Sequence, residues 1–295
     1  MSIIVIRKLY FFVFLSFAPV IVSGQFSFHL PLKVVNKSNN ELIQLNDTTK
    51  HKKKNTDGLY FGVNLGFYKA NHYSASYYNG SGVNNLDSAI TNYLNYPQIK
   101  QLLIYDFSLA ELPAKMHYSP AFLLGVYLKY AIKNSGIIVQ FNIAKLRAND
   151  VFTLVIDDPN NYSSEPVYKQ ESIQGIEQRA SIDLGYSYTF NPHSNYRPFI
   201  QFGGNLTSTK FIENKIKIES LQLSITNSYY SIHAIEQGGI GFGAFAGGGM
   251  NLIFNESISI MPTLNMYYTQ AKMGGYTKAK LNSTFYVSVI LNGIF

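Results

Sequence analysis

The chain has 295 residues, a formal net charge of +7 at pH 7, and 23 tyrosines and 21 phenylalanines but no tryptophan. The absence of cysteine excludes disulfides, cysteine-ligated metals, thiol catalysis and a lipid anchor on an amino-terminal cysteine. Basic residues are dispersed apart from His51–Lys54, which argues against nucleic-acid binding, and the many aromatic and few charged residues favour a β-rich protein.

The first 24 residues have the pattern of a secretory signal peptide. Arg7 and Lys8 form a positively charged start, and the apolar stretch Leu9–Val22 follows. This stretch is shorter than the roughly 20 residues that a helix needs to span a bilayer. A cleaved signal peptide is therefore favoured over a membrane anchor, and the predicted cleavage lies between Gly24 and Gln25.

Residues 25–57 are polar and are predicted to form a flexible arm on the periplasmic side, with binding of a partner as the alternative. After the signal peptide, no apolar run approaches the length of a membrane-spanning helix. If the chain crosses a membrane, it must do so as a closed β-barrel, because lipid offers no partners to unpaired backbone groups.

Eight segments alternate apolar side chains with small, polar or tyrosine side chains, as strands between lipid and a lumen do. The first is Gly58–Lys69, in which apolar residues recur at every second position from Leu59 to Phe67. The other predicted strands, in chain order, are Ala121–Ile132, Ile137–Arg147, Ser172–Phe190, Arg197–Lys210, Gly239–Phe254, Ile258–Gln270 and Leu281–Phe295. The many glycines of the sixth strand predict close packing or strong curvature there.

The connections between these segments alternate in length. Those after the first, third, fifth and seventh strands have about 50, 25, 28 and 10 residues, whereas the others are short turns, as in outer-membrane barrels. The predicted fold is therefore all-β: a transmembrane antiparallel up-and-down β-barrel of eight strands with long extracellular loops, formed by residues 58–295. A ten-stranded barrel, in which residues 212–235 supply an extra hairpin, is the alternative.

The last segment, Leu281–Phe295, has one apolar face and one mostly polar face and ends on an aromatic residue. It resembles the closing strand of bacterial outer-membrane β-barrels, whose terminal aromatic residue is part of the signal read by the barrel-assembly machinery. The resemblance implies that Phe295 is an assembly signal and that this machinery is a partner. It also implies that the last strand pairs with Gly58–Lys69, which removes both edges of the sheet.

Three features together resemble the PorT-like outer-membrane β-barrels, small barrels common in Bacteroidota with an architecture like that of the OmpA membrane domain. They are the start at Gly24 and Gln25, the first strand with Gly62–Gly66, and the end at Phe295. The resemblance covers about residues 58–295. It implies an outer-membrane location, a link to protein secretion, no cofactor and no catalytic residue.

The first long connection, residues 70–119, is predicted to have its own fold, because structureless loops of this length are uncommon. Asn84–Ser88 starts a predicted helix with Tyr93 and Leu94 on one side, and Pro97 suits the first turn of a second helix. Tyrosine offers a large contact area at a low entropic cost. The many tyrosines of this loop predict that it binds a protein partner, with a cap over the barrel as the alternative.

An eight-stranded barrel has an interior just wide enough for its own side chains. The inward-facing charged residues Lys129, Glu177, Arg179 and Asp183 are therefore predicted to form a packed lumen network, since buried charges are tolerated when they are paired. A narrow pore for small solutes is the alternative interpretation.

An outer-membrane lipid hydrolase is a less favoured alternative. Ser231 and His233 would share one face of an extended segment with Glu236 nearby, which are the elements of a nucleophile, base and acid. The other histidines do not have the spacing of a metal site. We expect a non-enzymatic structural or interaction component, with a subunit of a secretion or uptake complex as one form of this role. We expect it to be surrounded by outer-membrane lipid and lipopolysaccharide and to have no cofactor or metal.

Overall fold

The computed structural model describes residues 57–162, 165–226 and 238–292. Several predictions fall outside these ranges: the predicted signal peptide, its cleavage point between Gly24 and Gln25, nearly all of the predicted arm, and Phe295. No helix of the described residues is long and apolar enough to cross a membrane.

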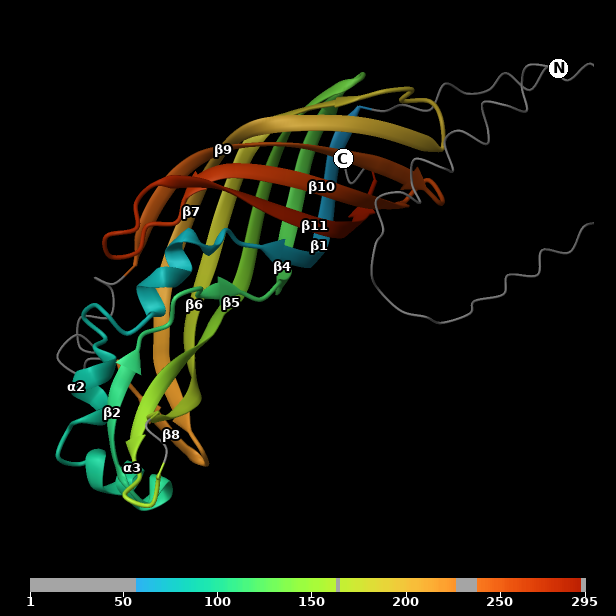
Figure 1. The fold of residues 1–295 in the computed structure, drawn as a ribbon. Coiled ribbons are helices and arrows are strands. Elements are labelled where there is room, and N and C mark those ends of the chain that lie inside the picture. The colour runs from blue at the N-terminus through green and yellow to red at the C-terminus, as the bar shows by residue number, and fades with distance from the viewer. Residues whose placement is uncertain (1–56, 163–164, 227–237, 293–295) are drawn as a thin grey trace, which may run out of the picture. The chain divides into compact units, whose positions relative to one another are not determined.

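Eight antiparallel strands form a closed ring (Figure 1). In ring order they are β1 (Gly58–Lys69), β4 (Ala121–Ile132), β5 (Ser135–Asp157), β6 (Val167–Thr189), β7 (Tyr196–Ile218), β9 (Gly239–Ile253), β10 (Ile258–Gln270) and β11 (Ala279–Leu291). The ring closes between β1 and β11, where Phe61 lies opposite Leu291 and Lys69 lies opposite Ser283. Because β7 pairs directly with β9, no further strand of the described residues lies between them in the ring, as the ten-stranded alternative with a hairpin at 212–235 would require.

An apolar belt surrounds this ring. On β4, for example, Phe122, Leu124 and Val126 are exposed, while Leu123 and Tyr127, at the intervening positions, are buried. Every strand of the ring has exposed apolar side chains at such outward positions, and we call these residues the belt. The predicted alternation between a lipid-facing side and a lumen side is confirmed, and the fold is a transmembrane β-barrel.

Three strands of the ring, β5, β6 and β7, have 23 residues each. A membrane-spanning strand needs about 9–11 residues, so these strands continue well beyond the belt. The prediction that β5 ends at Arg147 and β7 at Lys210 is wrong, and much of the 25-residue loop expected after β5 is strand. The β5–β6 ladder continues without a break to the pair Ile156 and Val167.

Further elements join these extended strands at the long-loop end. Strands β2 (Asp106–Glu111) and β3 (His117–Tyr118) pair with β5, and β8 (Leu221–Ser224) pairs with β7. The first loop also forms the 3₁₀ helix η1 (His72–Tyr78) and the α-helices α2 (Leu86–Ile90) and α3 (Tyr96–Leu103).

The two predicted helices have the expected starting signals. The Asn85 side chain caps α2 by accepting a hydrogen bond from the backbone N–H of Ser88 at 2.8 Å, and Pro97 lies in the first turn of α3. Helix α2 is shorter than predicted and ends at Ile90. Tyr93 and Leu94 therefore do not continue its buried face, and both are exposed.

The extended strands and the first loop share one apolar core. Leu154 of β5, Ile173 of β6 and Ile216 of β7 belong to it, together with Leu86 of α2 and Ile99 of α3. We call this part the platform, defined as residues 70–119, 145–175 and 211–226. The main apolar core of the protein thus lies beyond the belt, whereas the lumen of the barrel is mostly polar.

Candidate functional site

The charged residues predicted as one lumen network lie in three tiers. Glu177 and Arg179 form an upper tier next to the platform, Asp183 belongs to a middle tier, and Lys129 lies at the end with the short turns. Of these four, Glu177 and Arg179 are in contact. The other two residues have separate sets of partners.

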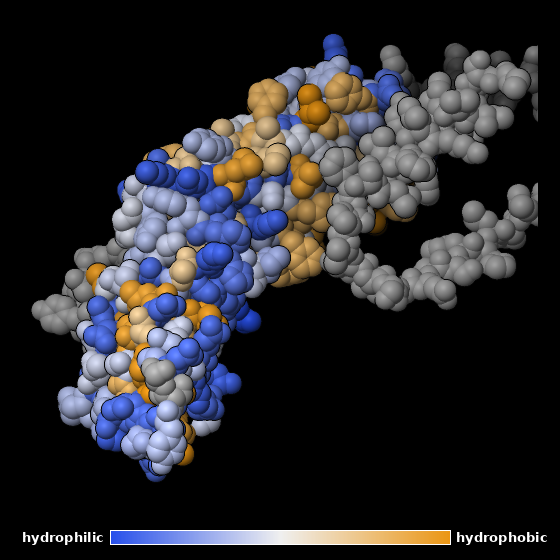
Figure 2. All heavy atoms as spheres, in the orientation of Figure 1, coloured by the Kyte–Doolittle hydropathy of each residue, from blue (hydrophilic) through white to orange (hydrophobic). Residues whose placement is uncertain are grey.

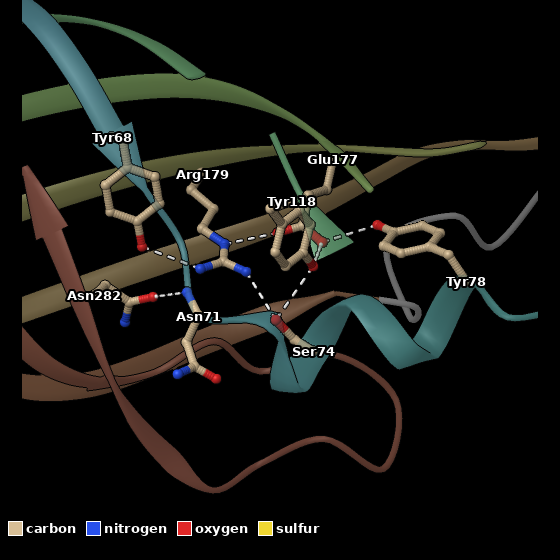
Figure 3. Close-up of polar contacts among 8 residues, drawn as sticks. All are labelled: Tyr68, Asn71, Ser74, Tyr78, Tyr118, Glu177, Arg179 and Asn282. Atoms are coloured by element: carbon tan, nitrogen blue, oxygen red, sulfur yellow. Dashed lines mark hydrogen bonds and ion pairs between the residues drawn. The ribbon is translucent and has the colours of Figure 1, made fainter. Parts of the chain in front are cut away.

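The upper tier is a buried ion pair. Arg179 Nε lies 2.7 Å from Glu177 Oε1, and the two side chains are 3% and 0% exposed. The residues are two positions apart on β6, so their side chains point to the same face of the strand. The guanidinium also donates hydrogen bonds to the hydroxyls of Tyr68 at 3.0 Å and Ser74 at 2.9 Å (Figure 3).

The second carboxylate oxygen of Glu177 fixes the first loop over the lumen. Its Oε2 accepts hydrogen bonds from the hydroxyls of Tyr78 at 2.9 Å and Tyr118 at 2.8 Å (Figure 3). Burial, and secondly the negative charge of Glu177, raises the pKa of both hydroxyls well above the usual range. Both tyrosines therefore remain protonated donors at neutral pH, and η1 caps the lumen.

The ring of Tyr78 fits a space that β6 and β7 provide. A Cβ atom on Gly175 would lie 2.0 Å from Tyr78 Cγ, so a glycine is required beneath the ring. The ring stacks on Phe211 at a centroid distance of 5.9 Å, and Asn214 Nδ2 donates to the Tyr78 carbonyl at 3.3 Å. Tyr78 and Tyr118 are two of the many tyrosines of the first loop that led to the prediction of a binding surface. Both are buried in the cap and so are not available to a partner.

The middle tier crosses the lumen as a chain of hydrogen bonds. Asp183 Oδ1 accepts from Asn205 Nδ2 at 2.5 Å, and Oδ2 accepts from the Tyr267 hydroxyl at 2.9 Å. The chain continues through three further buried side chains, Asn265, Tyr286 and Gln140. These residues come from β5, β6, β7, β10 and β11, so the tier joins both sides of the barrel.

Two hollows lie on either side of the middle tier. One has about 340 Å³ of empty space and is lined by Arg179 and Tyr68 above and by Asn205 and Tyr267 below. The other, of about 450 Å³, lies at the short-turn end and is lined by Lys129 among others. The two hollows share no lining residue, and the middle tier lies between them.

The residues considered for catalysis, Ser231, His233 and Glu236, lie outside the described residues. Within the described ranges, no group of three histidine, cysteine, aspartate or glutamate side chains could hold a metal ion. His72 and His117 do come together, with ring centroids 6.2 Å apart. The role of His72 there is structural, because its Nδ1 accepts a hydrogen bond from the backbone N–H of Tyr118 at 3.1 Å.

A closed antiparallel ring with an outward apolar belt and a polar lumen defines the class of transmembrane β-barrels. The sequence matches no family model and no curated protein. The chain is similar to the solved structure of Neisserial surface protein A, with 9% identity and a TM-score of 0.37, over 80% of this chain and 97% of that one. It is similar to the outer membrane protein OprG from Pseudomonas aeruginosa, with 10% identity and a TM-score of 0.36, over 80% of this chain and 93% of that one. It is also similar to the attachment invasion locus protein Ail of Yersinia pestis, with 9% identity and a TM-score of 0.32, over 79% of this chain and 98% of that one. The assignment to the class rests on the ring and belt of this chain.

Proposed function

We propose that the chain is a non-enzymatic bacterial outer-membrane protein that presents the platform outside the cell as a binding surface for a protein partner. The amino terminus and the short turns then face the periplasm. The observation that carries this proposal is that the first loop is packed against the extended strands. It shares an apolar core with three strands that run beyond the belt, so it offers a preorganised surface, and binding to it loses little conformational entropy.

The platform also exposes large apolar side chains that do not belong to its core. In the first loop, Tyr93, Leu94 and Ile104 are 80%, 59% and 73% exposed. Apolar side chains are visible among the polar surface of the platform in Figure 2. Exposed apolar groups beside a polar surface are typical of protein contact sites, and Tyr93 has the amphipathic ring found in many binding hot spots.

Two features support a closed barrel over the alternative of a small-solute pore. The cap over Glu177 and Arg179 covers the lumen at the platform end, and the middle tier crosses it near Asp183. Conduction would require both sets of buried hydrogen bonds to open. We therefore expect the intact protein to be silent in planar bilayers under conditions in which an open pore conducts.

Outer-leaflet lipopolysaccharide is proposed as the lipid environment of the platform base. Just beyond the belt, Lys145 on β5 and Lys210 on β7 lie on either side of Gln178 in register. Three further cationic side chains are exposed nearby: Lys69, Arg147 and Lys217. Lys215 is also close, but it is paired with Glu213 at 3.7 Å. A cationic strip above an apolar belt matches an anionic headgroup above acyl chains.

The protein partner is tested by purifying the barrel from outer membranes under native conditions. We expect a specific protein to co-purify with the native chain and to be lost with Tyr93→Ser combined with Ile104→Ser. Tyr196→Ser is the matched control, because Tyr196 is 67% exposed but lies at the short-turn end. The resemblance to PorT-like barrels predicts that the partner belongs to a secretion or uptake complex. The adaptor role fails if nothing co-purifies with the native chain or if the platform variant retains the same protein.

A further inference from the structure

The hollow at the short-turn end is a pocket with three cationic side chains in its lining. Lys133, in the turn between β4 and β5, is exposed, and the other two lie deeper. The pocket has about 450 Å³ of empty space, counted to its open mouth, and its lining includes Lys129 of β4, Arg197 of β7, Asn251 of β9 and the ring of Tyr127. Pro192, in the turn between β6 and β7, lies at the rim. The pocket therefore opens at the end that the proposed orientation places in the periplasm.

The two deeper cations have no acidic partner in the part of the chain that the structure describes. None of the ion pairs found there includes Lys129 or Arg197. Arg197 is 8% exposed and lines the same pocket as Lys129. Asp57, on the strand end nearby, accepts a hydrogen bond from the backbone N–H of Lys133 at 2.5 Å. Buried like charges without a counterion are unfavourable, so the pocket has the electrostatics of an anion site.

The hydrogen-bond donors of both cations are only partly used. Lys129 Nζ donates to the hydroxyls of Ser187 at 3.2 Å and Thr189 at 3.0 Å, which leaves one of its three N–H groups. Arg197 donates through Nε to the Ser194 carbonyl at 2.8 Å and forms a side-chain hydrogen bond with Tyr60. Among the described residues, these two contacts leave further N–H groups of the guanidinium for a ligand.

A third polar side chain completes the donor set. Asn251 lies opposite Arg197 in the β7–β9 ladder, and its buried Oδ1 has no hydrogen-bond partner within the described residues. The oxygen and nitrogen of an amide can exchange places by a flip of the side chain. Asn251 can thus present its NH₂ group to the same anion as Lys129 and Arg197.

We propose that this pocket binds a phosphate group, carried by a small periplasmic molecule or free in solution, between Lys129 and Arg197. A doubly charged phosphate neutralises both cations, and its oxygens can accept the remaining N–H donors from several directions. The rings of Tyr60 and Tyr127 would flank the rest of the molecule. The site is independent of the platform and of its partner.

Inorganic phosphate is the probe for this site. The full chain, folded in non-ionic detergent micelles in low-chloride buffer, is titrated with phosphate by isothermal titration calorimetry. We expect one saturable site, weakened at least about tenfold by Lys129→Met and by Arg197→Gln, because each removes a charge-assisted hydrogen bond. Lys129→Arg retains the charge and should bind within a few-fold of the native protein.

Controls separate a specific site from general attraction. Lys272→Met removes an equally positive, exposed side chain from the connection between β10 and β11, at the other end of the barrel, and should leave binding unchanged. Heat-modifiable migration verifies that each variant is folded. If Lys129→Met does not fold, the phosphate affinity of Arg197→Gln is compared with that of Lys129→Arg and of the native protein. The proposal is overturned if the folded native barrel shows no saturable phosphate binding, if both charge-removing variants bind as tightly as the native protein, or if acetate binds as tightly as phosphate.

Discussion

The barrel and the platform share three strands, β5, β6 and β7, yet the interiors of the two regions are opposite in polarity. In the barrel part of β5, Gln140 points inward and Phe141 outward into the belt. Farther along the same strand, Leu146 and Leu154 point inward and Arg147 outward. The alternation with a period of two continues without interruption, but the apolar face changes sides. The surrounding medium thus decides which face is apolar: lipid outside the barrel, and water outside the platform.

Because of this inversion, the stability of the two regions depends on different interactions. In the lumen, stability depends on complete pairing of polar and charged groups, because a buried group left without its partner is strongly unfavourable. In the platform, stability depends on filled apolar volume, because deletion of buried methyl groups leaves a cavity. The same kind of substitution should therefore have different effects on the two sides of Ala144.

The largest effect is expected in the upper tier. Arg179→Met leaves the Glu177 carboxylate buried without its cation, and we expect a loss of about 3–5 kcal/mol in the free energy of unfolding. Urea-induced unfolding in micelles measures it. Arg147→Met, on the exposed outer face of β5, is the control and should change stability little. A fully stable Arg179→Met protein would mean that the lumen does not require this ion pair.

A smaller effect that is confined to the platform is expected from Leu154→Ala. The side chain is fully buried in the apolar core, so we expect the loss of roughly 2–4 kcal/mol that is typical of such truncations. Limited proteolysis should then cut residues 70–119 faster, while heat-modifiable migration shows an intact barrel. Loss of the barrel itself would show that the platform and the barrel fold as one unit. That result would contradict the expectation that the two regions respond separately to substitution.

The junction between the two regions is tested by Gly175→Ala. The added methyl group would overlap the ring of Tyr78, and overpacking of this kind costs about 1–3 kcal/mol. The ring should leave its site, so that the Tyr78 hydroxyl becomes accessible to nitration in a folded barrel. Gly204→Ala is the control, because a Cβ atom there meets no atom within 4 Å. Unchanged protection of Tyr78 would argue against the cap geometry.

Strand positions within the belt could be predicted from the sequence because lipid imposes a strict pattern. The predicted bounds Gly58–Lys69, Ala121–Ile132 and Ile258–Gln270 match β1, β4 and β10 residue for residue. Where β5 and β7 leave the membrane, the apolar residues move to the other face of the strand. The pattern of outward apolar residues therefore stops at Arg147 and Lys210, and the strand ends predicted from it are too early.

The candidate site was predicted only in part. The alternation along β6 correctly placed Glu177 and Arg179 on the inner face. Their partners in the first loop could not be predicted, because Tyr78 and Ser74 lie 99 and 105 positions away in the sequence. Gly175 is the one nearby residue that could have indicated these partners. It lies on the same inner face of β6 as Glu177, and a glycine within a strand often marks a place where another group comes close.

The closure of the ring also bears on how slowly the protein can fold. Ser288 Oγ donates a hydrogen bond to Asn64 Oδ1 at 2.6 Å across 224 positions of sequence, and the whole β1–β11 ladder joins the two ends of the barrel. Contacts between distant parts of a chain require most of the chain-closure entropy to be lost before they stabilise anything. The last seam is therefore the expected kinetic bottleneck, and until it forms both outer strands expose unpaired edges that other chains can join.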